Sequence, residues 1–364
     1  MGTKLGIVGL PNVGKSTLFN ALTRGSAQVA PYPFTTTDPN VGVATVDDLR
    51  LAQLAQVIPH DRIIPTSIEF VDIAGLIRGA HEGEGLGNQF LSHIFAVDAI
   101  LHVVRCFEDP NIPPAMAGVA PGRDVEVITT ELLLKDLEIV ERRLDKERKL
   151  SKSGEKKAAA LVERLDQWKH ALEQGIPIRK IEWPASEHPQ AFGLDLLTSK
   201  PVVYLANVDE ASLKTPLPAV EPLAQIAARE QAELIVLCAK LEAELAELEP
   251  ADQATMRQEL GLTEPVLPRV VKHGYHLLHL ITFFTTASRI LQAWTVSEGT
   301  KAPQAAGVIH TDFERQFIRA EVVSTDTLVG CGGETQAKTN GLLRVEGKNY
   351  VVQDGDVIHF RVGG

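Results

Sequence analysis

The chain has 364 residues, of which 44% are hydrophobic and 23% are charged, and its formal net charge is -11. This length allows two or three globular domains, and no apolar stretch reaches the roughly 18 residues that a membrane-spanning helix requires. The composition therefore excludes a membrane-spanning protein. The acidic balance argues against a surface that coats itself with nucleic acid, so neither a membrane nor DNA is an expected partner.

The cysteines and the N-terminus indicate the compartment. Cys106, Cys238 and Cys331 lie far apart, which favours reduced thiols over a disulfide framework or a zinc site. The N-terminus runs directly into a strand-like segment, without an apolar block or a cleavage site, so we expect no export. These features predict a cytoplasmic protein.

The first predicted element is a strand, a turn and a helix. Residues 5–8 are apolar and compatible with a strand, and residues 17–22 have the composition of a helix. Between them the chain reads Gly-Leu-Pro-Asn-Val-Gly-Lys-Ser from Gly9 to Ser16, which matches the phosphate-binding Gly-x-x-x-x-Gly-Lys-Ser in its expected context. Lys15 then places a charge on the outer phosphates, and the Ser16 hydroxyl can bind Mg²⁺.

Two further segments have the order expected of a nucleotide switch. Residues 32–40 form a threonine-rich loop that can supply a second hydroxyl to Mg²⁺. The strand predicted at 67–71 ends in Asp72-Ile-Ala-Gly75, which places a carboxylate near the metal and the Gly75 N–H near the terminal phosphate. Together with the phosphate loop, these segments predict a P-loop nucleoside triphosphatase.

Three later strands complete the predicted sheet. They cover residues 99–104, 201–205 and 234–237, and they are almost continuously apolar. Strands of this kind, separated by helical stretches, indicate a parallel sheet that is buried on both faces. The fold class is therefore α/β.

Residues 126–174 interrupt this pattern. Two apolar series with helical spacing mirror each other about the polar turn at 151–154, and they comprise Leu133, Leu137, Val140 and Leu144, then Leu161, Leu165, Trp168 and Leu172. An antiparallel helical hairpin follows. Between residues 141 and 157 eight basic residues stand against four acidic ones, a local charge of +4. The tip is either a contact arm for RNA or a solvated insertion.

From residue 278 the sequence favours a separate α+β module. Strands are expected at 280–284, 319–323, 348–352 and 357–361, and the glycine-rich residues 330–334 are expected to form a loop.

These motifs resemble those of the Obg-related GTPases, and specifically the Obg-like ATPase (YchF) family. The resemblance covers essentially the whole chain, and it also rests on Pro33-Phe-Thr-Thr36, on Asn207-Val-Asp-Glu210 and on the ending at 351–358. It implies a G domain at 1–125 and 200–277, a helical insertion at 126–199 and a β-grasp-like TGS domain at 278–364. It also implies ribosomes or ribosomal RNA as a partner.

The resemblance assigns roles to individual residues. It implies that Ser16 and Thr36 bind Mg²⁺ and that Asn207 and Val208 line the base. The residues implied to hold the phosphates are Asn12, Val13, Gly14, Lys15, Ser16 and Thr17. Asn12 also points to K⁺ beside the phosphates, where a cation offsets developing charge.

The base segment predicts a preference for ATP. A guanine site uses Asn-Lys-x-Asp, whereas this chain has Val208 in place of the lysine and Glu210 in place of the aspartate. Adenine needs no carboxylate. Asn207 and the backbone around Val208, Cys238 and Ala239 are expected to form the hydrogen bonds to adenine.

Catalysis is expected to be slow. The residue after Gly75 is Leu76, which cannot orient water as the glutamine of many GTPases does. The family resemblance suggests a histidine in the loop at 107–116, but none occurs there. His81 and His93 are the nearby alternatives in sequence. Lys15 and Gly75 remain the catalytic candidates.

Two other functions stay open, an ordinary GTPase and a ribosome- or RNA-binding adaptor with a structural nucleotide.

Overall fold

The computed structural model describes residues 4–24, 41–75, 86–151, 156–182, 184, 188–214, 218–262 and 264–363. They form two compact units. The first contains residues 4–23, 41–42 and Glu69–Val266, and the second contains Val43–Ile68 and Leu267–Gly364. Within the described residues, no helix combines the length and apolarity needed to span a membrane.

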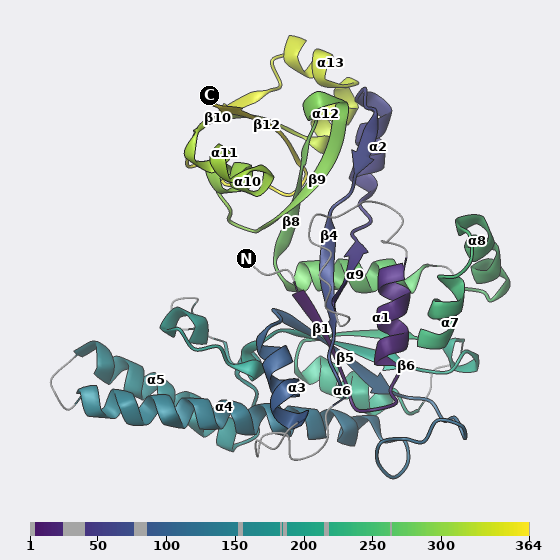
Figure 1. Ribbon diagram of the computed structural model, residues 1–364, viewed down its shortest axis with the longest axis vertical. Helices are drawn as coiled ribbons and strands as arrows, with labels where there is room; N and C mark the ends of the chain where they lie inside the picture. The colour runs from purple at the N-terminus through teal and green to yellow at the C-terminus, as the bar shows by residue number, and fades with distance from the viewer. Residues whose placement is uncertain are drawn as a thin grey trace. The chain divides into compact units, whose positions relative to one another are not determined.

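One six-stranded sheet consists mainly of strands from the first unit (Figure 1). In spatial order its strands are β2 (Val41–Thr45), β4 (Ser67–Asp72), β1 (Lys4–Val8), β5 (Ala99–Arg105), β6 (Val202–Asn207) and β7 (Glu233–Leu237). The pairings of β1 with β4 and β5, of β5 with β6, and of β6 with β7 are parallel. Every residue of β5 and β6 is buried, as their continuous apolar sequences predict. The α/β class is confirmed.

Seven helices accompany this sheet in the described sequence: α1 (Lys15–Arg24), α3 (Leu86–Phe95), α4 (Pro121–Ser151), α5 (Lys156–Glu173), α6 (Glu221–Arg229), α7 (Ala239–Leu245) and α8 (Pro250–Glu259). The phosphate loop precedes α1, and α7 follows β7 directly. Parallel strands bring their carboxyl ends to one edge of the sheet, where α/β proteins bind ligands.

The predicted hairpin is formed by α4 and α5 (Figure 1). Six of the eight residues in the predicted stripe are buried in one hydrophobic cluster around Trp168, and Leu137 and Leu161 pack against it half-buried. Helix α4 begins at Pro121, five residues earlier than expected, because proline is favoured in the first turn of a helix. The turn at 152–155 lies outside the described residues.

Asp136 fixes the base of the hairpin to the chain that enters β6. Its buried carboxylate accepts the backbone N–H groups of Leu197 and Thr198, both at 2.7 Å, and the Thr198 hydroxyl at 2.6 Å. Burial raises the pKa of Asp136 to about 6, although these hydrogen bonds oppose the shift. The hairpin is therefore joined to the sheet unit by a buried polar contact as well as by its covalent ends.

The second unit contains another six-stranded sheet. Its spatial order is β11 (Arg344–Glu346), β10 (Phe317–Ser324), β12 (Asp356–Val362), β8 (Leu280–Thr285), β9 (Ile290–Ser297) and β3 (Arg62–Ile64). Its helices are α2 (Leu49–Val57), α9 (Val266–Leu277), α10 (Ala302–Ile309), α11 (Thr311–Arg315), α12 (Thr325–Cys331) and α13 (Glu334–Thr339). The β-grasp-like (TGS) interpretation of this α+β unit stays a prediction.

Three details differ from the sequence analysis. Residues 43–68, expected in the G domain, group with the second unit: β3 pairs with β9, and Leu51 and Leu54 of α2 pack with Phe284. Residues 330–334 are not one loop, because α12 extends to Cys331 and α13 begins at Glu334. Residues 348–352 form only an isolated bridge from Val351 to Lys301.

Candidate nucleotide-binding site

The glycines of the phosphate loop are required by close backbone contacts. A Cβ on Gly9 would lie 2.4 Å from the Val103 carbonyl oxygen. Gly14 has φ of 98°, and a Cβ there would lie 2.4 Å from Asn207 Nδ2. Only glycine satisfies these positions, which leaves the N–H groups of the turn free to face an anion.

Lys15 lies at the start of α1 and is only 7% exposed. Its Nζ donates to the Leu10 carbonyl at 2.9 Å. Burial lowers the pKa of Lys15 to about 8, and the charge of Asp72 opposes this shift. A Cβ on Gly75 would lie 3.1 Å from the Lys15 Nζ, so the end of the Asp72–Gly75 segment lies directly against the phosphate loop.

Ser16 and Asp72 form a pair of oxygen ligands that fits Mg²⁺. The Ser16 hydroxyl donates to Asp72 Oδ2 at 2.7 Å. The other carboxylate oxygen, Oδ1, is buried and has no hydrogen-bond partner among the described residues. Magnesium prefers hard oxygen ligands and retains several waters, so one carboxylate and one hydroxyl suffice when phosphate oxygens complete the shell. Thr36 lies outside the described residues.

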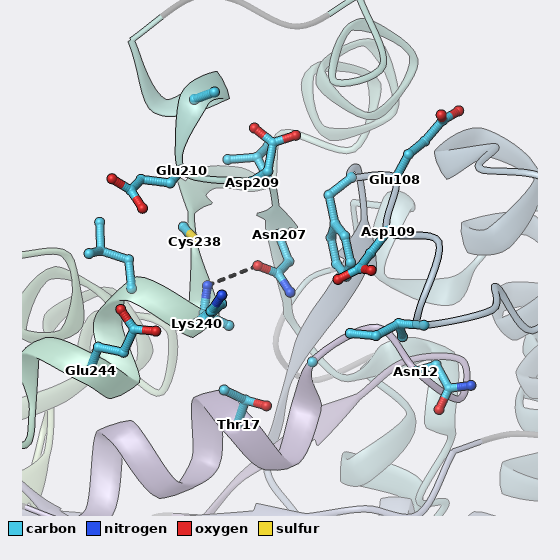
Figure 2. A pocket seen from close by; sticks show the side chains of 17 residues that line it. Asn12, Thr17, Glu108, Asp109, Asn207, Asp209, Glu210, Cys238, Lys240 and Glu244 are labelled. Carbon is cyan, nitrogen blue, oxygen red and sulfur yellow. Dashed lines mark hydrogen bonds between the residues drawn. The ribbon is translucent and has the colours of Figure 1, made fainter.

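Asn207 connects three segments of the site. Its Nδ2 donates to the Val13 carbonyl at 2.8 Å. Its Oδ1 accepts the Ala239 N–H at 2.9 Å, which is the dashed line in Figure 2. The Val208 N–H donates to Leu237. The backbone N–H groups of Val208 and Ala239 are therefore not available to a base, and Asn207 retains one N–H and one lone pair for that purpose.

A cavity of about 550 Å³ adjoins the loop, within the range of small-molecule sites. Seven of the predicted binding residues line it: Asn12, Gly14, Thr17, Asn207, Val208, Cys238 and Ala239. Val13, Lys15 and Ser16 do not line it and lie on the phosphate side. Glu108 and Asp109 lie on one side and Glu210 and Glu244 on the other (Figure 2). This geometry suits a purine base beside a triphosphate cradle.

Sequence reasoning missed one wall of this cavity. Phe107, Glu108, Asp109 and Ile112 all line it, and they belong to the loop at 107–116, for which the sequence predicted no binding residue. Their position in the sequence could have identified them, because the loop follows the carboxyl end of the buried strand β5, where α/β sheets bind ligands. Of the histidines considered, His81 lies outside the described residues, and the Nδ1 of His93 is buried without a hydrogen-bond partner in the described structure.

Comparisons with known proteins show which family the chain is related to. A family model described as a 50S ribosome-binding GTPase matches residues 4–143, and the C-terminal domain model of YchF-type GTPases, described as a protein of unknown function, matches residues 280–363. The Ribosome-binding ATPase YchF of Bacillus subtilis is 49% identical over 363 residues, which cover 99% of both chains. The chain belongs to the YchF family.

Other YchF proteins agree with this assignment. The Ribosome-binding ATPase YchF of Escherichia coli O157:H7 is 48% identical, with 99% of both chains covered. The solved structure of the Schizosaccharomyces pombe YchF GTPase superimposes with a TM-score of 0.90 at 36% identity, and the match covers 99% of this chain and 98% of that one. The two bacterial relatives are named as ATPases, whereas the Schizosaccharomyces pombe protein is named as a GTPase.

Proposed function

We propose that this YchF-family protein is a Mg²⁺-dependent nucleoside triphosphatase of the cytoplasm that hydrolyses ATP in preference to GTP and binds ribosomes according to its nucleotide state. The observation that carries the proposal is the convergence of Lys15, Ser16 and Asp72 on a glycine-constrained phosphate loop beside a purine-sized cavity. The relatives named Ribosome-binding ATPase support the choice of nucleotide and partner.

The residues of the site have two roles, to bind the nucleotide with Mg²⁺ and to stabilise the charge that develops during hydrolysis. Backbone N–H groups of residues 12–17 hold the phosphates, and Lys15 carries a positive charge toward them. Ser16, Asp72 and Thr36 would hold Mg²⁺, which neutralises phosphate oxygens when bound. The Gly75 N–H is proposed to contact the terminal phosphate. Lys15 and Gly75 thus stabilise the charge that develops there.

The base contacts favour adenine because Glu210, with a side chain one methylene longer, replaces the short aspartate of a guanine site, and Val208 replaces its lysine. Val208 is 2% exposed and carries no charge. The Asp209 carboxylate accepts the Ser212 N–H at 2.9 Å and its hydroxyl at 2.6 Å, so it caps the following turn. The remaining N–H of Asn207 is the proposed base contact, with Cys238 beside the cavity.

Slow turnover and a second cation are part of the proposal. Leu76 supplies no hydrogen bond to water, so stimulation by a partner is expected. Asn12 has φ of 61° and donates its Nδ2 to the Pro113 carbonyl at 3.1 Å. This orientation leaves its Oδ1 as the oxygen available to K⁺ near the phosphates.

The experiment that tests the proposal is single-turnover hydrolysis of ATP with and without ribosomes. If the protein is a nucleotide switch of this kind, ribosomes should accelerate the hydrolysis of ATP. An adaptor with a structural nucleotide would bind ribosomes but show the same slow rate in both conditions, which would contradict the proposal.

The hairpin offers a defined test of ribosome contact. Arg148 is already paired with Asp166 at 2.8 Å, whereas Lys146 and Lys149 are exposed on α4 and have no ion pair within the described structure. We expect Lys146→Glu with Lys149→Glu to weaken ribosome binding and to reduce the slope of its salt dependence by about two, since each phosphate contact contributes roughly one unit.

The matched control reverses a charge that is already paired. Arg142→Glu also lies on α4, but Arg142 forms an ion pair with Glu138. Co-sedimentation with ribosomes over a range of salt concentrations measures both variants. Unchanged binding of the double variant at every salt concentration would show that the hairpin is a solvated insertion.

A further inference from the structure

The last residue of β5, Arg105, is a buried cation next to the nucleotide cavity. It is 2% exposed, and among the described residues its acceptors are backbone carbonyls and it forms no ion pair with a carboxylate. Its guanidinium donates instead to three backbone carbonyls: Nε to Phe107 at 3.0 Å, Nη2 to Ile112 at 2.7 Å and Nη1 to Asn12 at 3.4 Å. A buried charge is costly unless hydrogen bonds compensate it, so this arrangement has a specific structural role.

These three contacts join two parts of the site. Phe107 and Ile112 belong to the wall of the cavity, and Asn12 belongs to the phosphate loop. The Arg105 Cζ also lies 4.4 Å from the centre of the Phe107 ring, a cation–π distance. The hydrogen bond from Asn12 to Pro113 reinforces the same connection. One side chain therefore sets both the position of the wall and the orientation of an aromatic ring that lines the cavity.

Only arginine fits this position. The five N–H donors of a guanidinium lie in one plane, so it can reach carbonyls in different directions while its face stacks on a ring. A lysine ammonium is a compact charge that cannot do both. On the other side of the phosphate loop, Asn207 binds Val13 and Ala239 in a comparable way. The loop is thus held from two sides, by an amide and by a guanidinium.

We propose that Arg105 is a positioning residue that sets the base-side wall of the nucleotide cavity and thereby determines affinity for the nucleoside part of the ligand. The inference rests on the proposed nucleotide-binding function. The contact of Arg105 with the phosphate loop, to the Asn12 carbonyl, is the longest of the three at 3.4 Å, and the two shorter ones hold the wall. Because the phosphate cradle itself is built from the backbone of residues 9–16, affinity for a bare triphosphate should depend much less on Arg105 than affinity for ATP does.

The test compares ATP with inorganic triphosphate, which has no base, by calorimetric titration of the full chain. Arg105→Met removes the charge and Arg105→Lys retains it without the planar fork. We expect both to raise the Kd for ATP about tenfold or more, as for loss of charged hydrogen bonds, and to change the Kd for triphosphate less than about twofold.

Arg123 provides the matched control. Its guanidinium donates to the Ala117 and Gly118 carbonyls of the same loop, at 2.7 and 3.0 Å, but it does not line the cavity. Arg123→Met should leave both dissociation constants unchanged. Thermal unfolding shows whether each variant is folded, and Arg105→Lys decides the result if Arg105→Met fails to fold.

Each outcome has a distinct meaning. Unchanged ATP affinity in the folded Arg105 variants would overturn the role of Arg105 and leave the proposed function intact. An equal loss for ATP and triphosphate would also overturn it, because Arg105 would then act on the phosphate cradle. An equal loss of ATP affinity in Arg123→Met would assign the effect to the loop in general. Wild-type protein that binds no ATP would overturn both the proposed function and this inference.

Discussion

Lys15→Ala is expected to reduce ATP hydrolysis by about 10²- to 10³-fold, the range for loss of one group that stabilises transition-state charge. The variant should stay folded, since the side chain makes one hydrogen bond in this structure, to the Leu10 carbonyl. Phosphate release measures the rate, and circular dichroism measures the fold. Lys135→Ala, which removes an exposed ion pair with Glu138 on α4, should hydrolyse ATP normally. Turnover of Lys15→Ala like that of the wild type would refute the site assignment.

The same residue predicts a pH dependence of binding. Burial lowers the pKa of Lys15 to about 8 in the nucleotide-free protein. The ammonium attracts phosphate, and its charge is lost as the pH rises through about 8, so the contribution of Lys15 to ATP affinity should be fully present at about pH 7 and below and should fall as the pH rises through 8. The residual binding of Lys15→Ala should not show this fall.

Val208→Lys combined with Glu210→Asp is expected to shift nucleotide preference toward GTP by roughly 5- to 150-fold, equivalent to about 1–3 kcal/mol for a charged contact to guanine. Ser212→Ala is the matched control, because it removes the hydroxyl contact to Asp209 in the same turn but does not line the cavity, and it should not affect preference. The ratio of ATP to GTP dissociation constants measures both variants. An unchanged ratio in the double variant would show that this segment does not select the base.

The phosphate side of the site could be predicted because its determinants are local. Consecutive residues of the loop supply the glycines, Lys15 and Ser16, and the spacing to helix α1 fixes their geometry. The parallel strands and the hairpin could be predicted for the same reason, since their periodicity is visible within single segments. In each of these cases, the residues that determine the feature lie close together along the chain.

The features that were missed depend on contacts between distant residues. Strand β3 has three residues and pairs with β9 more than 200 positions later, so no local pattern marks it. Asn207 could be assigned to the base from its motif, but its bond to Val13 required the fold. Arg105 ends a strand of buried apolar residues, and only the structure shows three carbonyls converging on it.

The central claim is that this nucleotide site selects ATP. Competition of ATP and GTP for the wild-type protein, with labelled ATP as the displaced ligand and Mg²⁺ present, tests it most directly. Glu210 in place of the short aspartate of a guanine site, and Val208 in place of its lysine, predict that ATP binds at least about fivefold more tightly than GTP. Tighter binding of GTP would contradict the account and would identify the protein as an ordinary GTPase with an altered base motif.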